Sequence, residues 1–572
     1  MNVLFAALFA STTFVQVSPA SPTPDTMQAA ITAALANVVA SDASSRVPGL
    51  SSTRAAQART RSLYQQAGRR LLWLSGTGES SRVNALIDAL LGAPAQALRV
   101  DAYGLETLAA ALERARNQPS ASALADADVR LTAAFVAYGT DVLIGQVDPA
   151  DITKAWHIDR QLINIDTALA SVLTAADAPA AFAALRPQEV SYAALTASLA
   201  QYRQIVDRGG WPLVRDVGVV RPGDTVSAGF AGDLLGRLYA EGYIGAPASL
   251  QPLRDSGGGD HPAGRAGTNT PVIYDSVLSN AMQEYQRRHA LAVDAIIGPS
   301  TRRSLNRSAT DRLRQIAANL ERHRWMPRER GDRYVIVNVP AYRLRAVDAG
   351  REVLTMNVVV GAEYRGRSTP VFSDSMAYVV FRPYWNVPDG IAARELWPKQ
   401  RADTSYFSRN GYESVRASWG SYVRQTPGGD NALGLVKFIF PNDFAIYLHD
   451  TPSQALFSER MRAASHGCIR VEHPDSLARF VLGWDDDRIQ AAMHTGPDNQ
   501  RVNLDAKLPV YIVYFTAYAS DGTMRFADDI YRRDAVVMRA INAGAFPTDD
   551  ARRALAALRR VRGARDTAGA AR

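Results

Sequence analysis

The sequence predicts a multidomain α+β protein. In its first part apolar residues recur at helical spacing with few glycines between them, as in Leu86, Ile87, Leu90 and Leu91. From about residue 333 onward, short runs rich in β-branched and aromatic side chains replace this pattern and indicate strands. The chain of 572 residues is long enough for several domains, each with its own core.

The first expected element is a secretory leader at residues 1–25. Residues 3–10 form a short apolar run, Ser18-Pro19-Ala20 offers a small-residue cleavage site, and Asp25 is the first charged side chain. The absence of Lys and Arg before the apolar run departs from the usual pattern. No apolar run approaches the ~18 residues that span a bilayer, so we expect export without a stable membrane span.

Two helical units should follow the leader. Residues 26–215 are predicted to form a helical scaffold domain, for which the sequence indicates no chemistry. A second unit covers residues 218–308, with apolar side chains at helical spacing in 278–285 and a turn at Gly298-Pro299 before the next helix. Within it, the Gly/Asp/Arg-rich stretch 254–269 should be a loop. A generic helical hairpin is the alternative for this unit.

A connecting helix at 309–332 should lead into the strand-rich part at 333–520. Between its strands, residues 386–431 form an insertion with many aromatic side chains and a helix near 391–399. The predicted strands are 334–339, 353–360, 377–381, 435–440, 445–448 and 510–515.

The net charge of +8 at pH 7 comes mainly from the end of the chain. Residues 551–572 carry seven Arg against one Asp, and the remainder is close to neutral. A basic helix can bind an anionic surface, but a solvated helix that frays is the simpler interpretation. We therefore expect a C-terminal helical tail at 521–572 and no nucleic-acid partner.

The single cysteine of the chain, Cys468, is the main chemical signal. It lies in Ser465-His466-Gly467-Cys468-Ile469-Arg470, and His449 precedes it by 19 positions. An imidazole can lower the pKa of a thiol and take its proton, and a glycine lets backbone N–H groups turn toward an oxyanion. A free cysteine is often a buried apolar residue, but the polar flanks favour a nucleophile. The histidines lack metal-ligand spacing, so we expect no metal and no cofactor.

This motif resembles the signature of the YkuD-type L,D-transpeptidases, cysteine enzymes that cross-link peptidoglycan. The resemblance rests on His449, a gap of 15 residues, Ser465-His466-Gly467-Cys468 and Arg470. Three further stretches, 324–327, 381–388 and 437–442, resemble the large periplasmic branch of that family. The resemblance is strongest after about residue 310 and implies a mixed-β catalytic domain at 333–520 in a periplasmic protein.

The resemblance extends to two other parts of the chain. Unit 218–308 is similar to the small three-helix peptidoglycan-binding module found beside many wall enzymes, which implies contact with glycan strands. The insertion 386–431 would be a lid over the substrate cleft, with a purely structural excursion as the alternative. Within it we expect Trp419 to be more exposed than Trp397, which lies on the predicted helix.

The resemblance also implies roles for the residues around the thiol. His449 would act as general base toward Cys468, oriented either by the backbone carbonyl of Asp450 or by its carboxylate. His466 would shape the pocket and the oxyanion site and is the second candidate for the base. Backbone N–H groups of Gly467 and Cys468 would stabilise the oxyanion.

Three residues are candidates for contact with the substrate. Arg470 would pair with a substrate carboxylate or hold the loop. Ser465 would line the site or anchor the turn, and Asp450 would contact the substrate if its carboxylate does not orient the histidine.

The implied reaction is acyl transfer between two peptidoglycan stem peptides. The Cys468 thiolate would attack the carbonyl at the L-centre of residue three of a tetrapeptide stem and expel the terminal D-Ala. An amine of a second stem would then resolve the thioester and give a 3→3 cross-link. A lid that excludes water would favour the amine over water. The family also implies acylation by carbapenems.

Three other functions share some of these sequence features. An L,D-carboxypeptidase, or an amidase-like hydrolase, would share the same acyl-enzyme, and the residues do not separate it from a transferase. A non-catalytic wall-binding scaffold fits poorly with an intact His449/Cys468 pair. A papain-like protease is disfavoured because its nucleophile precedes its histidine in sequence.

Overall fold

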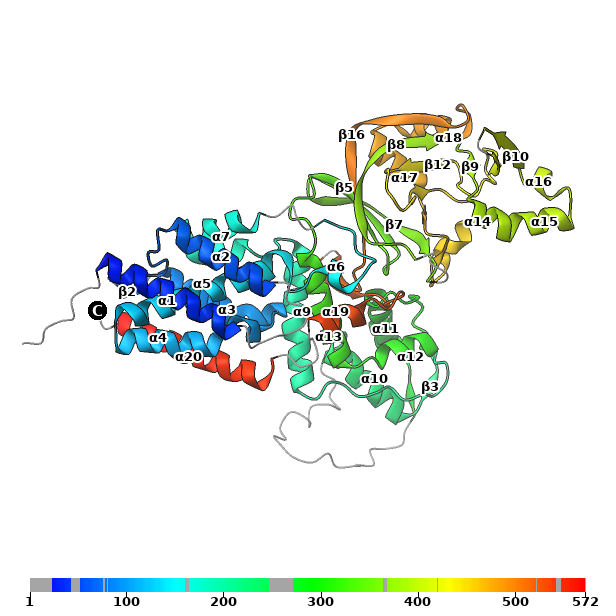
Figure 1. Cartoon of the computed structure of the whole chain (residues 1–572). Helices are drawn as coiled ribbons and strands as arrows, with labels where there is room; N and C mark the ends of the chain where they lie inside the picture. The colour runs from blue at the N-terminus through cyan, green and yellow to red at the C-terminus, as the bar shows by residue number, and fades with distance from the viewer. Residues whose placement is uncertain are drawn as a thin grey trace, which may run out of the picture.

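The computed structural model describes residues 23–42, 52–75, 78–79, 81–159, 164–245, 271–363, 368–418, 420–520, 522–541 and 547–570. Most of the expected leader, the loop at 254–269 and Trp419 lie outside these residues. A helical half and a strand-rich half are joined near α13, with a smaller helical unit beside the junction (Figure 1). Within the described ranges, no helix is both long and apolar enough to cross a membrane.

The helical half is built around α5 (Ala121–Ile144), which is buried along most of its length. Its first turn is capped by Ser120, whose hydroxyl accepts the N–H of Ala123 at 3.1 Å and so satisfies a donor that the helix leaves open. Phe135 on α5 packs edge-to-face on Phe182, with ring centroids 5.7 Å apart. The other helices of this half are α1 (Pro24–Asp42), α2 (Ser52–Gln66), α3 (Ser81–Gly92), α4 (Leu105–Asn117), α6 (Pro149–Ile152), α7 (Ile165–Thr174), α8 (Ala178–Ala184) and α9 (Val190–Asp207).

The C-terminal helix belongs to this helical half. α20 (Asp549–Ala570) lies against α3 and α4 and is drawn in red at the scaffold end of Figure 1. Its apolar face, including Leu555 and Leu558, is buried in the scaffold core, and Arg562 pairs with Asp88 of α3 at 2.9 Å. The expectation of a solvated, fraying tail is therefore wrong, because the leucines recur at helical spacing and find an apolar partner surface.

The rest of the expected tail is also structured. β17 (Ala517–Ser520) and β18 (Thr523–Phe526) form an antiparallel hairpin, so the segment 521–572 is not purely helical. α19 (Asp534–Ala540) packs against α13, and the buried carboxylate of Asp534 pairs with Arg322 at 2.5 Å.

The smaller helical unit contains α10 (Ala228–Ala240), α11 (Ser276–Arg288) and α12 (Pro299–Leu305). β3 (Thr225–Val226) pairs with β4 (Val272–Ile273), and the three helices share a core around Phe230, Leu234 and Met282. The unit is docked on the scaffold through Arg237, whose guanidinium lies 3.8 Å from the centroid of the Trp211 ring. Arg237 also pairs with Glu241, which accepts the hydroxyl of Tyr202 on α9.

The helix that was expected to connect two domains is α13, and it lies between the helical half and the strand-rich half. α13 (Ala309–Arg324) is almost entirely buried, and at its end Arg324 and Glu321 form an ion pair at 2.8 Å. Glu321 accepts the backbone N–H groups of Gln146 and Val147 from the scaffold. On the other side Asn319 donates to Thr516 of the strand-rich half at 2.8 Å. This helix therefore bonds both halves directly.

The strand-rich half contains a nine-stranded mixed sheet in the order β14-β7-β15-β13-β12-β8-β16-β5-β6. β7 also pairs with β6, so the sheet closes on itself. Three of its pairings, β13 with β15, β16 with β5 and β14 with β7, are parallel. Its strands are β5 (Arg333–Asn338), β6 (Arg343–Asp348), β7 (Arg351–Gly361), β8 (Phe372–Phe381), β12 (Val436–Ile439), β13 (Leu448–His449), β14 (Ala463–Ser465), β15 (Ile469–Val471) and β16 (Gln500–Val513). Two helices, α17 (Pro474–Leu482) and α18 (Asp486–His494), follow β15.

The insertion at 386–431 has its own small core, formed by Val387, Leu396, Phe407 and Val423 among others. Trp397 is 37% exposed and packs on Phe407 with ring centroids 5.1 Å apart. Figure 1 shows the insertion at the far end of the strand-rich half. Its elements are β9 (Trp385–Asn386), α14 (Asp389–Ile391), a π-helical turn (Ala392–Leu396), α15 (Trp397–Ala402), α16 (Tyr406–Arg409), β10 (Tyr412–Ala417) and β11 (Gly420–Gln425), with the strands in the order β10-β11-β9.

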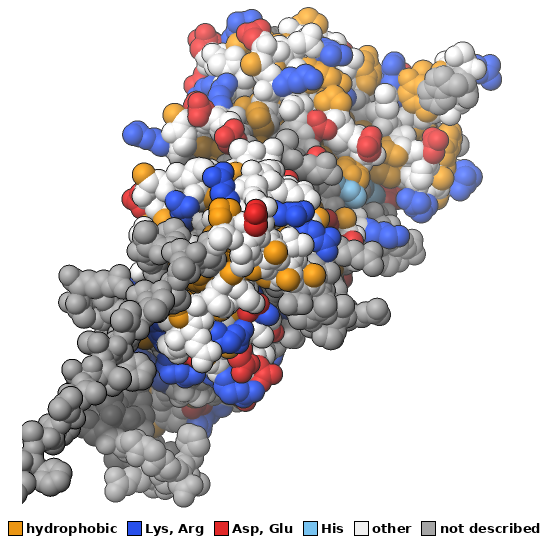
Figure 2. All heavy atoms as spheres, turned by 60° about the vertical axis from the view of Figure 1, so that its left-hand side comes forward, with side chains coloured by type: hydrophobic (Ala, Val, Ile, Leu, Met, Phe, Trp, Pro, Cys, Tyr) orange, Lys and Arg blue, Asp and Glu red, His pale blue; other side chains and the backbone are white. Residues whose placement is uncertain are grey.

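The face of the molecule drawn in Figure 2 carries Lys and Arg interspersed with Asp and Glu. Basic side chains are therefore not gathered into one stripe on this face.

Candidate active site

Two parallel strands bring the histidine and the cysteine of the motif together. β13 pairs with β15 so that Leu448 lies opposite Ile469 and His449 lies opposite Arg470. Because side chains alternate between the two faces of a strand, His449 and Arg470 point to one face. Cys468 lies directly before β15, two positions from Arg470, so in this register it is opposite Tyr447 and diagonal to His449. A separation of 19 residues in sequence thus becomes adjacency in the sheet.

His449 is buried and oriented by the next residue of the chain. Its Nδ1 lies 2.5 Å from the carbonyl oxygen of Asp450. A carbonyl oxygen can only accept, so Nδ1 carries the proton and Nε2 has a free lone pair. Burial, and then the charges of Arg470 and Lys437, lower the pKa of His449 to about 3. The imidazole is therefore neutral near pH 7 and able to take up a proton.

The Cys468 side chain is half-buried, and its Sγ lies 3.7 Å from the carbonyl oxygen of Ala445. Burial raises the pKa of the Cys468 thiol, while hydrogen bonds with Tyr447 and the charge of Arg470 act in the opposite direction. A thiol with a raised pKa beside an imidazole with a lowered pKa does not form a resting ion pair. The nucleophile therefore needs a base at the moment of attack.

Tyr447 is a member of this site that the sequence analysis missed. Its ring centroid lies 5.6 Å from that of His449, and its hydroxyl is close enough to Cys468 for the two groups to shift each other's pKa. Burial, and then the proximity of Cys468, raise the pKa of Tyr447, so the phenol keeps its proton and can donate it to a thiolate. Its position two residues before His449 was the available signal, because residues i and i+2 of an extended segment share a face.

The turn before the nucleophile is held by Ser465. Its hydroxyl donates to the carbonyl of Cys468 at 2.5 Å and accepts the N–H of Gly467 at 3.1 Å. Gly467 has φ of 128°, a conformation that favours glycine, and its carbonyl accepts from the Thr369 hydroxyl at 3.0 Å. The Gly467 N–H is thus engaged by Ser465, contrary to its expected role as an oxyanion donor. The N–H of Cys468 is the candidate that remains.

His466 links the turn to the insertion. Its Nε2 lies 2.9 Å from Oε1 of Glu395, a residue of the π-helical turn, and both side chains are partly exposed. The ring is thus engaged by the insertion and stands at the rim of the site. This placement fits the expected pocket-shaping role better than the role of second base.

The two remaining candidates differ in what they offer a substrate. The carboxylate of Asp450 accepts the N–H groups of Leu435 at 2.8 Å and Thr451 at 2.6 Å, and the residue is buried. Contrary to expectation, it therefore acts within the fold and is not free to contact a substrate. Arg470 is half-buried, and its Nε has no hydrogen-bond partner among the described residues. Burial lowers the pKa of Arg470.

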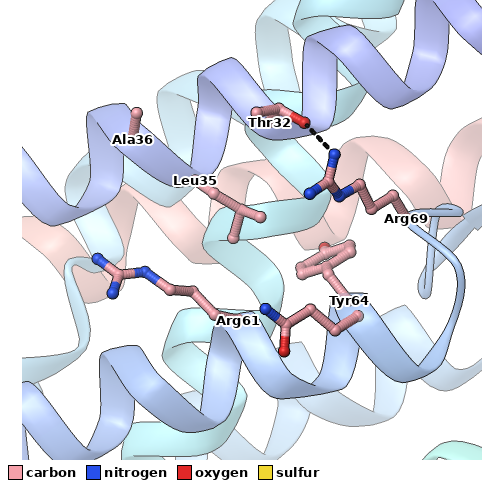
Figure 3. Close-up of a pocket in the computed structure, with 7 residues that line it drawn as sticks. Thr32, Leu35, Ala36, Arg61, Tyr64 and Arg69 are labelled. Atoms are coloured by element: carbon pink, nitrogen blue, oxygen red, sulfur yellow. Dashed lines mark hydrogen bonds between the residues drawn. The ribbon is translucent and has the colours of Figure 1, made fainter.

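Two cavities lie away from Cys468. One, of about 420 Å³, opens between α1 and α2 and is lined by Leu35, Tyr64 and two arginines, Arg61 and Arg69 (Figure 3). A second, of about 380 Å³, lies where the two halves of the molecule meet. In the part of the chain that the structure describes, no three His, Cys, Asp or Glu side chains are grouped as a metal site would require.

The site can now be compared with known proteins. Residues 332–512 match the YkuD family, described as the L,D-transpeptidase catalytic domain, and residues 58–199 match the family described as a scaffold domain. The chain therefore carries a YkuD-type L,D-transpeptidase catalytic domain together with a scaffold domain.

A curated relative from Haemophilus influenzae, named "Putative L,D-transpeptidase", is 33% identical over 240 residues. The match covers 38% of this chain and 48% of the relative, so the chain spans about half the length of that protein. Two solved L,D-transpeptidase structures were also found. That from Xylanimonas cellulosilytica has 18% identity and a TM-score of 0.15, covering 52% of this chain and 99% of its own. That from Stackebrandtia nassauensis has 13% identity and a TM-score of 0.21, covering 55% and 99%. At these TM-scores the two structures add nothing to the argument.

Proposed function

We propose that the protein is a peptidoglycan L,D-transpeptidase that forms 3→3 cross-links through a thioester on Cys468 and releases D-Ala. The observation that carries this proposal is the neutral, carbonyl-oriented His449 on the strand beside Cys468, inside a domain of the YkuD family. Because the imidazole is neutral, its Nε2 can accept the proton of the thiol, although the lowered pKa makes it a weaker base than an exposed imidazole.

In the first half-reaction His449 takes the proton of Cys468 through Nε2 while Sγ attacks the carbonyl of residue three of a tetrapeptide stem. The Tyr447 hydroxyl stabilises the negative sulfur, and the N–H of Cys468 donates to the oxyanion. The tetrahedral intermediate then collapses: the bond to D-Ala breaks, the D-Ala amine receives the proton from His449, and the thioester remains.

In the second half-reaction an amine of another stem replaces D-Ala. His449 takes a proton from the amine as it attacks the thioester carbonyl. The bond to Sγ breaks, and the proton returns to the sulfur, so the enzyme leaves the cycle unchanged. The insertion 386–431 acts as a lid that keeps water from the thioester, and the Glu395–His466 contact holds it near the site.

The other parts of the chain are assigned to location and substrate binding. We assign the helical unit 218–308 to glycan strands and the leader at 1–25 to export into the periplasm, both from sequence resemblance. Carbapenems should acylate Cys468, because they present a strained carbonyl to the same nucleophile.

The test is product analysis after incubation of the purified protein with tetrapeptide muropeptides. Liquid chromatography with mass spectrometry should find a cross-linked dimer that has lost one D-Ala, with the new bond between the third residues of both stems. Tripeptide as the sole product would make the protein an L,D-carboxypeptidase. No change in the muropeptides would favour a non-catalytic scaffold.

A further inference from the structure

The cavity of about 380 Å³ lies at the junction of three parts of the chain that are distant in sequence. Trp156 enters from the scaffold and pairs in a parallel bridge with Val371 of the catalytic domain. Arg322 and Trp325 enter from the α13 region, and Tyr531 and Arg533 from the segment before α19. In Figure 1 the labels α6, α13 and α19 meet at this junction.

Two donors on the wall of this cavity have no acceptor. Trp156 is 7% exposed, and its Nε1 is buried with no hydrogen-bond partner among the described residues. The same is true of Nη1 of Arg533. An unpaired buried donor destabilises the folded protein, and a charged one does so more strongly, so both atoms require an acceptor.

The arginines on the wall lie close to carboxylates, and the Asp529 carboxylate accepts the backbone N–H of Arg533 at 2.8 Å. Arg322 is paired with Asp534 at 2.5 Å, and Arg532 lies 3.7 Å from Glu363. Arg533 has no ion pair within the described ranges and instead stacks on Tyr514 and Tyr531, with 4.8 and 4.7 Å from its guanidinium carbon to the ring centroids. Burial lowers the pKa of Arg533, while Tyr514, Tyr531 and the charge of Asp529 act in the opposite direction.

The remaining wall is partly apolar, and Thr153, Ser368 and Glu363 also line it. The side chains of Trp156, Trp325, Val371, Val536 and Val537 contribute apolar surface. A pocket of this size with apolar walls and a few convergent polar groups is typical of a small-molecule site. The two open donors, Nη1 of Arg533 and Nε1 of Trp156, match a carboxylate, and the apolar side chains match an apolar body.

We propose that this cavity binds a small monocarboxylate with an apolar body, whose carboxylate accepts from Nη1 of Arg533 and Nε1 of Trp156. The existence of this binding site does not depend on which reaction Cys468 performs.

The bound carboxylate would be connected to the nucleophile turn through Thr369. Nη2 of Arg533 donates to the carbonyl of Thr369 at 3.1 Å, and the Thr369 hydroxyl donates to the carbonyl of Gly467 at 3.0 Å. Tyr531, on the same wall, donates to the carbonyl of Gly361, whose N–H donates to the Thr369 hydroxyl at 3.0 Å. Occupancy of the cavity should therefore alter the position of Gly467 and the reactivity of Cys468.

The test uses benzoate as the probe and benzamide as its neutral isostere, with the full-length protein and ligand-observed NMR titration. Benzoate should bind, and benzamide and inorganic phosphate should bind at least about 10-fold more weakly, because the site matches a single charge on an apolar body. Arg533→Gln should raise the Kd of benzoate about 10-fold or more. Trp156→Phe, which keeps an aromatic ring and removes the indole N–H, should raise it by about fivefold.

A matched control is Arg488→Gln, because Arg488 also stacks on an aromatic ring, 3.7 Å from Trp484, but lies outside the cavity. It should leave the Kd within about twofold of the unsubstituted value. Equal binding of benzoate to all four proteins, or tighter binding of phosphate, would overturn the proposal.

The connection to the active site has its own readout. Saturating benzoate should change the rate of Cys468 alkylation by iodoacetamide at least about twofold in the unsubstituted protein and leave it unchanged in Arg533→Gln. An unchanged rate in the protein with bound benzoate would contradict the connection through Thr369.

Discussion

At the scale of single residues, the thiol of Cys468 is protonated in the resting active site, and the imidazole of His449 is neutral. His449 has a lowered pKa and Cys468 a raised one, so the pair rests as neutral imidazole and thiol. The motif predicted this pair and placed the orienting acceptor at Asp450, because the acceptor is the next residue along the chain. It did not predict that Ser465 engages the N–H of Gly467, because that depends on the conformation of the turn.

His449→Ala should lower the rate of Cys468 acylation by a carbapenem about 10²-fold or more, which is the usual size of a general-base contribution. His466→Ala should have a smaller effect, because that ring is held at the rim by Glu395. Stopped-flow measurement of adduct formation ranks the two variants. A larger loss of acylation rate in His466→Ala than in His449→Ala would indicate that His466 is the base and His449 shapes the pocket.

Tyr447→Phe should shift the pH profile of Cys468 alkylation upward. Hydrogen bonding with Tyr447 lowers the pKa of the Cys468 thiol against the rise caused by burial, so removing the hydroxyl leaves the thiol protonated to higher pH. At pH 8 alkylation by iodoacetamide should therefore slow, and at sufficiently high pH the two proteins should become equal. An unchanged pH profile of Cys468 alkylation would show that the Tyr447 hydroxyl does not affect the pKa of the thiol.

At the scale of elements, a partly exposed contact between Glu395 and His466 joins the insertion to the nucleophile turn. Such a pair contributes about 0.2–1 kcal/mol, which is enough to bias an element between two positions but not to lock it. The contact between Glu395 and His466 thus suits a segment that opens to admit a stem peptide and closes over the thioester.

Glu395→Ala should raise the ratio of hydrolysed tripeptide to 3→3 dimer by up to about fivefold, because a lid that is held less well admits water. Glu413→Ala is the matched control, since Glu413 pairs with Arg424 inside the insertion. Chromatographic quantification of both products gives the ratio. An equal ratio in the two variants would make the insertion a structural element only.

Local patterns predicted the elements whose burial is set by their own sequence. β5 and β7 lie where β-branched residues are dense. The segment 445–448 shows how a neighbour overrides such a pattern: only its last residue is in β13, because Ala445 adopts φ of 52° and Asn442 bonds the chain around it. Leu558 lies on α20, which packs on α3 and α4. These two helices precede α20 by more than 400 positions in sequence, so no local pattern predicts the contact.

At the scale of the whole molecule, the C-terminal helix α20 packs on the scaffold, which is formed by the first half of the chain. α20 completes the scaffold core, α13 bonds both halves, and the smaller unit is docked through Arg237. The catalytic domain is thus anchored on a single connected body. This arrangement gives the basic C-terminal segment a structural role that its charge alone did not indicate.

Leu558→Ala should lower the free energy of unfolding by about 2–5 kcal/mol, the usual cost of truncating a buried leucine. Arg559→Ala, one position further on the exposed side of α20, should change it by less than about 0.5 kcal/mol. Urea unfolding followed by circular dichroism measures both values. Equal free energies of unfolding for the two variants would indicate that α20 is a solvated tail and does not pack on the scaffold.

The proposed reaction depends on Cys468 forming the acyl-enzyme, with His449 as its base. Intact-protein mass spectrometry during turnover of a tetrapeptide stem, without an acceptor, tests it most directly. The protein should gain the mass of the stem minus D-Ala, peptide mapping should place that mass on Cys468, and Cys468→Ala should show neither the adduct nor turnover. An adduct that persists in Cys468→Ala, or that maps to another residue, would contradict the claim.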